Sequence, residues 1–477
     1  MGLKKNLISN VVLTTSTVFI SFLTFPYITR TLSATNMGNV LFIDAFTQYF
    51  IIFSFLGIPF YGVREIARLS GKPDDQSRLV FTLVSLQFCL SIFLSIIFFA
   101  LTFIVPSLHQ NKDLVILGCL SVVATSFSIE WFYQGIENFT YITKRSLLIR
   151  VISVVAILFF VRHEDDQYPY YAILLGVIFL NSALNFGNYF IKFHRKFKGT
   201  LEFRPHIKPL LVLFSINVSV SVYTILDTII LGLFTNPISV SYYSVPLKLV
   251  KIIWVVVGSF SVVLIPRISK YFNDGNHKDA ADLLKRSLSL VFLLTIPFAF
   301  LCIFFPREIL TSIFGVKYLE AQISLQILSV VPLIIGVCNV FGTQFLLPIG
   351  YEKKILHATI FGLFTSLALN FLLIPSLRYV GSSIACITSE TAVCLYVYIK
   401  AKAEIKIPID APLIILILVS CITTVIVGIL IRNNLTNIYL ISCLCLMYII
   451  VFASLNFAFL KNDFINSLLK IKNNANG

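Results

Sequence analysis

Long apolar runs follow one another along nearly the whole chain, separated by short stretches rich in charged residues, proline or glycine. Most runs are close to the ~20 residues that a helix needs to cross the hydrocarbon core of a bilayer. The pattern predicts an all-α polytopic membrane protein with about fourteen transmembrane helices. The predicted segments are 7–28, 40–61, 79–105, 114–135, 146–161, 168–193, 209–233, 241–265, 287–305, 323–349, 355–375, 381–399, 411–431 and 439–460.

Composition supports the membrane assignment. Of 477 residues, 57% are hydrophobic and only 12% are charged, whereas a soluble domain has ~25% charged residues. A soluble enzyme is therefore excluded. The nine cysteines fall inside apolar runs without C-x-x-C or metal-ligand spacing, so we expect small buried hydrophobic residues and no metal site.

The basic residues indicate the orientation. If Met1 is cytoplasmic and the segments alternate, 28 of the 37 basic residues lie on the cytoplasmic side, seven lie outside, and two lie within a helix. Cytoplasmic loops retain lysine and arginine, so both termini are predicted to be cytoplasmic. The apolar run after Met1 has no small-residue cleavage site and is interpreted as a first spanning helix. The net charge of +15 then reflects topology and does not indicate nucleic acid as a partner.

The chain is predicted to have two related halves. The longest cytoplasmic connection, around residues 192–208, has the position of a linker. Gly38 and Arg64 are 26 positions apart, as are Ser241 and Arg267, and each pair brackets a predicted helix. The predicted domains are an N-terminal six-helix lobe (1–198), a C-terminal six-helix lobe (199–405), and two additional helices with a cytoplasmic tail (406–477).

Charged residues inside the predicted spans are the candidate functional groups, because an intramembrane charge needs a partner or a watery cavity. Lys248 and Lys251 share a helix face, and Lys248 lies at the predicted depth of Asp227. The pair Asp227 and Lys248 has two equal interpretations, a structural ion pair or a functional one. Lys251 is the better candidate for binding phosphate. The full set is Asp44, Glu130, Asp227, Lys248, Lys251 and Glu390.

Two more basic residues, and two of the acidic ones in this set, have open interpretations. Arg30 lies on the side that disfavours basic residues, which makes it informative, whereas Arg64 also fits an ordinary cytoplasmic anchor. Asp44 and Glu390 fit proton-carrying carboxylates, because burial raises a carboxyl pKa, and fit structural acceptors equally well.

Enzyme motifs are weak. The spacing of His277 and Asp282 matches the H-x-x-x-x-D pattern of some membrane acyltransferases, but it lies in a charged connection without a second catalytic element. No glycine-rich phosphate loop, G-x-S-x-G or metal cluster is present in the sequence. We therefore expect a transporter and no enzyme.

The run Glu130-Trp-Phe-Tyr-Gln-Gly-Ile-Glu137, with Glu130, Trp131, Tyr133, Gln134 and Gly135, resembles the W-x-Y-Q-G-x-E element of Wzx-type polysaccharide repeat-unit flippases. These flippases form a branch of the multidrug/oligosaccharidyl-lipid/polysaccharide exporter superfamily. Four further stretches are similar in the same order: 26–32 with Gly38, 57–65, 226–232 and 265–270. The resemblance covers most of the first twelve segments and fades in the last two.

The resemblance implies a flippase with two pseudo-symmetric six-helix lobes around a cationic cavity. It would move a polyprenyl-diphosphate-linked oligosaccharide, for O-antigen (lipopolysaccharide), capsule or a similar polysaccharide, from the inner to the outer leaflet of a bacterial plasma membrane by alternating access. The two extra helices would form a groove for the lipid tail. No cofactor is implied beyond a proton or sodium gradient, and the implied partners are this lipid-linked substrate, membrane lipid, a polysaccharide polymerase and chain-length machinery.

The resemblance also suggests roles for particular residues. The basic residues that match it, and that we expect to bind substrate, are Arg30, Arg64, Lys248, Lys251 and Arg267. The acidic candidates for ion coupling are Asp44, Asp227 and Glu390.

Two alternatives remain. A drug or cation antiporter of the same superfamily is expected to have an acidic cavity, and the two lysines argue against it. A membrane polysaccharide polymerase or glycosyltransferase would need a sizeable outer loop or a catalytic carboxylate motif, and the predicted outer loops are short.

Overall fold

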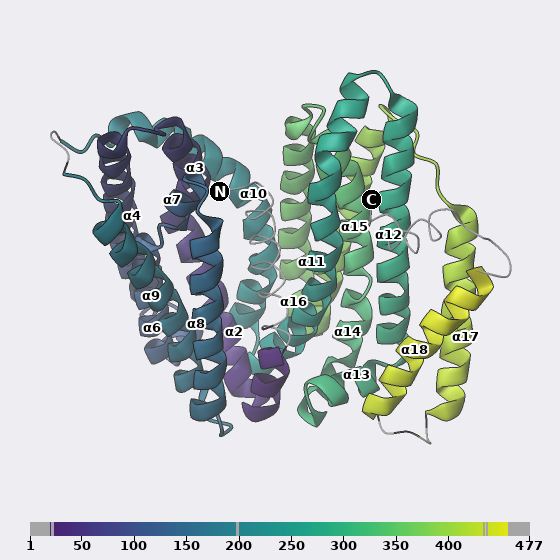
Figure 1. Cartoon of the computed structure of the whole chain (residues 1–477). Helices are drawn as coiled ribbons and strands as arrows, with labels where there is room; N and C mark the ends of the chain where they lie inside the picture. Colours follow the sequence, from purple (N-terminus) through teal and green to yellow (C-terminus); the bar gives the residue numbers. More distant parts are fainter. Residues whose placement is uncertain (1–19, 21–22, 197–199, 433–434, 436, 457–477) are drawn as a thin grey trace. The chain divides into compact units, whose positions relative to one another are not determined.

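The structure is a computed structural model that describes residues 20, 23–196, 200–432, 435 and 437–456, without the side chains of 215–224, 259–263 and 273 (Figure 1). The described residues contain helices and no strands, which confirms the predicted all-α class. Within them, ten helices or merged helix pairs are long and apolar enough to cross a membrane. The predicted segment 7–28 lies mostly outside the described residues.

The chain forms two compact units, Met1–Ser241 and Tyr242–Gly477. The predicted lobe boundary at residue 198 stays a prediction, and α10 packs against α2 in the N-terminal unit. That unit contains a helix over 23–31 and then α2 (Ala34–Phe55), α3 (Ile58–Arg68), α4 (Pro73–Leu101), α5 (Pro106–His109), α6 (Lys112–Ala124), η1 (Thr125–Phe127), α7 (Glu130–Gly135), α8 (Phe139–Phe160), α9 (Gln167–Lys192) and α10 (Arg204–Phe234).

The N-terminal unit is held together by α2, which packs against α4, α6, α9 and α10. The predicted helix 40–61 is divided in the structure, because Leu56 and Gly57 both have positive φ, 45° and 78°. Gly57 tolerates this conformation since it has no Cβ. A second break separates α6 from α7 within the predicted segment 114–135, where η1 intervenes. Both breaks direct short helices, α3 and α7, against each other.

The C-terminal unit begins within α11 (Pro237–Asn273). Its core joins α12 to α15 and α15 to α16, and is built from aliphatic side chains such as Leu284, Val340 and Val397. The other elements are α12 (His277–Phe304), α13 (Pro306–Ile313), η2 (Val316–Ala321), α14 (Gln322–Leu328), α15 (Val331–Phe341), η3 (Gly342–Leu346), α16 (Glu352–Lys402), α17 (Ala411–Ile431) and α18 (Asn437–Leu455).

Two predicted segments meet inside α16. The sequence predicts separate helices 355–375 and 381–399, and the structure has a kink between them at Arg378, with φ 49° and ψ −127°. Pro375 precedes the kink and removes a backbone donor from the helix. The sequence correctly predicts two helical segments here, and the connection is a single non-helical residue.

The last two helices form a hairpin, α17 with α18, seen in yellow-green and yellow in Figure 1. The hairpin packs on α12 and α13. An ion pair joins Arg432, after α17, to the buried Glu308 of α13. Lys285 of α12 and Asp410, which precedes α17, lie 3.7 Å apart. Charged contacts at both ends of α17 therefore attach the hairpin to its own unit.

Candidate functional site

The motif in α7 is a packing element. The aromatic ring of Trp131 lies so close to Gly62 of α3 that a Cβ on this glycine would be 2.3 Å from the ring. Gly135 meets Ile66 of the same helix in a similar way, at 2.7 Å. Trp131 is 3% exposed. The motif residues thus allow α3 and α7 to approach closely, and the two glycines are the positions where the backbones need space.

A buried charge lies beside this motif. Nη2 of Arg145 is 2.9 Å from Oε2 of Glu130, and the arginine side chain is only 3% exposed. Arg145 also donates to the side-chain oxygen of Asn185 in α9, and its guanidinium carbon lies 5.8 Å from the ring centre of Tyr141. Gln134 donates to the other carboxylate oxygen of Glu130 at 3.4 Å. This cluster joins α7, α8 and α9.

Arg145 is one of the 28 basic residues that the sequence assigns to the cytoplasmic side, and its burial is not predicted there. The helix begins at Phe139, whereas the predicted segment begins at Ser146. With the correct start, Ile142, Arg145 and Ile149 fall at spacings of three and four, and all three are buried. This spacing is the sequence signal that predicts the burial of Arg145.

Tyr133 completes the connection between α7 and α9. Its hydroxyl donates to the backbone oxygen of Asn185 at 2.7 Å and accepts from Nδ2 of Asn188 at 2.9 Å. Two motif residues are therefore connected to α9. Tyr133 bonds to α9 directly, and Glu130 is connected to it through Arg145. The arrangement fixes the positions of α7, α8 and α9 relative to one another.

The basic candidates of the N-terminal unit lie at its surface. Arg30 is exposed near the end of the helix over residues 23–31. The Arg64 side chain is 59% exposed, pairs with Glu65 at 3.0 Å, and lies 5.3 Å from the ring centre of Tyr61. An exposed side chain with an acidic neighbour agrees with the anchor interpretation of Arg64, and substrate binding by it stays a prediction.

The acidic candidates of this unit lie among tyrosines. Asp227 is 4% exposed and interacts electrostatically with Tyr49 of α2. Asp44 interacts with the buried Tyr170 and Tyr171 of α9. These surroundings fit carboxylates that accept hydrogen bonds and carboxylates that exchange protons, so ion coupling stays a prediction for both.

The C-terminal unit contains the remaining candidates. Lys248 and Lys251 are partly buried on α11, while Arg267 of the same helix is exposed. Glu390 of α16 is 6% exposed and lies near Cys338 and Cys394. Because Asp227 and Lys248 belong to different units, their pairing stays a prediction.

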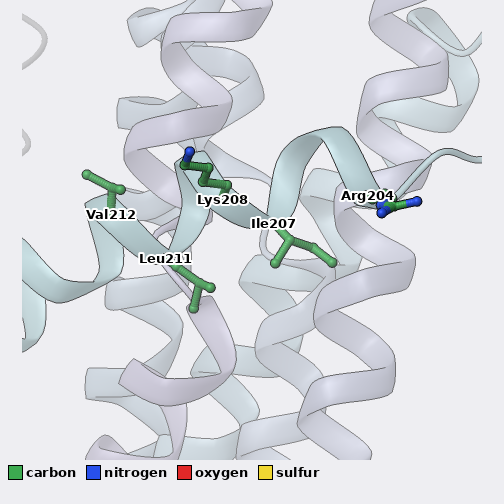
Figure 2. A pocket seen from close by; sticks show the side chains of 5 residues that line it. All are labelled: Arg204, Ile207, Lys208, Leu211 and Val212. Carbon is green, nitrogen blue, oxygen red and sulfur yellow. The ribbon is translucent and has the colours of Figure 1, made fainter.

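A cationic and aliphatic face lies at the start of α10, where sequence reasoning predicted a linker. Figure 2 shows its five side chains, which line a cavity of about 410 Å³. We call this surface the α10 face. It consists of Arg204, Ile207, Lys208, Leu211 and Val212.

Two family models and a relative of known name are similar to this chain. The family model described as polysaccharide biosynthesis protein matches residues 3–272, more than half of the chain, and the MatE family model matches residues 213–372. A protein of Escherichia coli (strain K12) named "Putative O-antigen transporter" is 25% identical over 400 residues, which are 82% of this chain and 95% of the relative.

Two solved structures share the fold. A lipid II flippase, MurJ, in an inward closed conformation has a TM-score of 0.74 and 14% identity, covering 96% of this chain and 100% of its own. A multidrug resistance MATE family transporter in an inward-facing conformation has a TM-score of 0.59 and 13% identity, with coverages of 84% and 94%. At this identity the similarity establishes the architecture alone.

Proposed function

Because the chain belongs to the polysaccharide biosynthesis protein family, we propose that it is a Wzx-type flippase for a polyprenyl-diphosphate-linked oligosaccharide. The family match over residues 3–272 is the observation that carries this proposal. The O-antigen transporter named among the relatives supports the same substrate class, and the fold shared with a lipid II flippase is compatible with it.

The transfer of a charged headgroup across a bilayer explains why such a protein needs charged groups inside apolar helices. A diphosphate and its sugars do not cross ~30 Å of hydrocarbon unaided, while a prenyl tail gains nothing by leaving the bilayer. Cationic side chains within the spans would stabilise the diphosphate during transfer. Lys248 and Lys251, partly buried on α11, have the right charge for this role.

We assign the diphosphate to Lys251, Arg30 and Arg64 in turn as the protein alternates between conformations, and Lys248 and Arg267 are further candidates for substrate binding. The positive-inside bias supports transfer from a cytoplasmic leaflet, with both termini cytoplasmic in a bacterial plasma membrane. Coupling to a proton or sodium gradient would use Asp44, Asp227 or Glu390. A polysaccharide polymerase and chain-length machinery would consume the exported repeat unit.

Deletion of the gene tests the proposal. Lipid-linked oligosaccharides from the deletion strain should accumulate as single repeat units protected from a membrane-impermeant oxidant in intact spheroplasts, and expression of the wild-type chain should restore their exposure. Normal exposure of repeat units in the deletion strain contradicts the proposal.

A multidrug or cation antiporter is the second candidate, since the MatE model matches residues 213–372. Drug susceptibility of the same deletion strain separates the two functions. Increased susceptibility to cationic drugs with unaltered oligosaccharide export favours the antiporter. In both cases the chain acts as a transporter, and we propose no enzymatic step for it.

A further inference from the structure

The α10 face has the composition of a site for a charged amphipathic molecule. Its positions, 204, 207, 208, 211 and 212, follow one another at helical spacing and therefore share one side of the helix. Two cationic side chains occupy the end nearest the helix start, and aliphatic side chains continue the same side. The aliphatic side chains are exposed, at 40% for Ile207, 47% for Leu211 and 57% for Val212.

The opposite side of α10 makes the contacts that hold the helix in its unit. Leu210 is fully buried, and the backbone of Leu210 and Phe214 closely surrounds Gly57. The hydroxyl of Tyr61 lies 2.6 Å from Nδ1 of His206. The α10 face is therefore not needed for packing within the N-terminal unit, and changes to it should leave the fold intact.

Arg78 holds the residues that precede α10 in place. Arg78 of α4 donates to the backbone oxygen of Thr200 at 2.7 Å and pairs with Glu202 at the same distance. Glu202, which precedes α10 in the chain, is therefore paired with Arg78. Neither Arg204 nor Lys208 forms an ion pair with a residue that the structure describes. Two cations one helical turn apart thus remain available to an anion from outside the chain.

We propose that the α10 face binds an anionic glycerophospholipid. Its phosphodiester would lie between Arg204 and Lys208, since a guanidinium donates to two phosphate oxygens and an ammonium adds a compact charge. Its acyl chain would lie along Ile207, Leu211 and Val212. From Lys208 to Val212 the helix rises ~6 Å, so the aliphatic part begins where a lipid tail follows its headgroup.

The aliphatic half favours a lipid over free phosphate. Inorganic phosphate would use only the two cations, whereas the exposed aliphatic side chains gain from covering by hydrocarbon. The excess of basic residues in the predicted cytoplasmic loops assigns this end of α10 to the cytoplasmic side. Anionic headgroups attract basic residues there. None of the five residues of the α10 face is among those proposed to bind the transported substrate.

Native mass spectrometry of the purified full chain with phosphatidylglycerol or phosphatidylcholine tests the proposal. The double variant Arg204→Ala/Lys208→Ala should lose about tenfold or more in affinity for phosphatidylglycerol. The control Lys278→Ala/Arg286→Ala, which removes the same charges from exposed positions of α12, should change it less than twofold. Equal losses in both double variants, or equal affinity of the wild type for the two lipids, overturn the site.

Two further variants separate the sources of phosphate and guard against misfolding. Leu211→Gln should weaken phosphatidylglycerol binding several-fold without changing displacement by inorganic phosphate. An unaltered lipid affinity in this variant overturns the lipid assignment and leaves a phosphate site. Arg204→Lys/Lys208→Arg retains both charges and should bind phosphatidylglycerol within about threefold of the wild type. Because the readout is lipid binding, failure here leaves the proposed transport function untouched.

Discussion

Arg145 and Glu130 form an ion pair in which one partner is buried and the other is half-exposed, with side-chain exposures of 3% and 36%. The asymmetry decides what each substitution does. Removing Glu130 leaves a buried guanidinium with only neutral hydrogen-bond partners, Asn185 and Ser146, whereas removing both charges leaves no buried ion.

Glu130→Ala should therefore lower the free energy of unfolding by ~1.5–3 kcal/mol. The double variant Glu130→Ala/Arg145→Met should recover part of that loss, because the buried charge is gone. Thermal unfolding of the detergent-solubilised protein measures both. A double variant no more stable than Glu130→Ala contradicts this account.

The contact of Gly62 with Trp131 gives a second prediction. A methyl group at Gly62 would meet a ring that is itself buried, so Gly62→Ala should cost ~1–3 kcal/mol of stability through overpacking. Gly176 of α9 is the matched control, since nothing lies within 4 Å of the position its Cβ would take. Gly176→Ala should be neutral or stabilise by ~0.5–1 kcal/mol. Equal melting temperatures for the two variants would refute the steric argument.

The sequence predicted the helices because apolar runs and charged punctuation are local signals. It placed α17 correctly at 411–431 and detected both halves of α16. The division of α2 from α3 was missed, since it lies inside a continuous apolar run, and its backbone turn at Leu56 and Gly57 packs closely against α10. The burial of Arg145 was missed because the predicted segment begins at Ser146, one residue after it, whereas the helix begins at Phe139.

The two ion pairs of the C-terminal hairpin should differ in strength. Glu308 is 4% exposed in its side chain, so Arg432→Ala leaves a buried carboxylate and should cost ~1–3 kcal/mol. Lys285 and Asp410 are 3.7 Å apart, and the Asp410 side chain is 15% exposed, so Lys285→Ala leaves a carboxylate that water reaches and should cost less than ~1 kcal/mol. Hydrogen exchange of α17 and α18 should rise clearly in the first variant alone. A larger effect from Lys285→Ala would reverse the ranking.

His206 predicts a dependence on pH. Burial lowers the pKa of His206, which precedes the predicted span 209–233, while Glu65 and Glu202 raise it and Arg78 lowers it by smaller amounts. The folded protein thus prefers the neutral imidazole. Its contribution to stability is complete above the unfolded pKa of ~6.5 and is lost as the pH falls through the lower folded value.

The melting temperature should accordingly fall between pH 7.5 and pH 5.5, and His206→Asn should reduce this difference. The control His163→Asn changes an exposed histidine in the connection before α9 and should retain the wild-type difference. If His206→Asn has the same pH dependence as the wild type, this histidine does not contribute to it.

Lys251 provides the sharpest test of the transport mechanism, because it is partly buried on a predicted spanning helix and carries the charge that a diphosphate requires. Lys251→Ala should reduce surface polysaccharide by tenfold or more at normal protein levels, and Lys251→Arg should retain part of the export. Lys278→Ala removes the same charge from an exposed position of α12 and should leave export unchanged. Quantitative sugar analysis of the cell surface, normalised to membrane-fraction immunoblots, gives the readout. Unaltered export by Lys251→Ala would show that the diphosphate crosses without this lysine, and the assignment would then pass to Arg30 and Arg64.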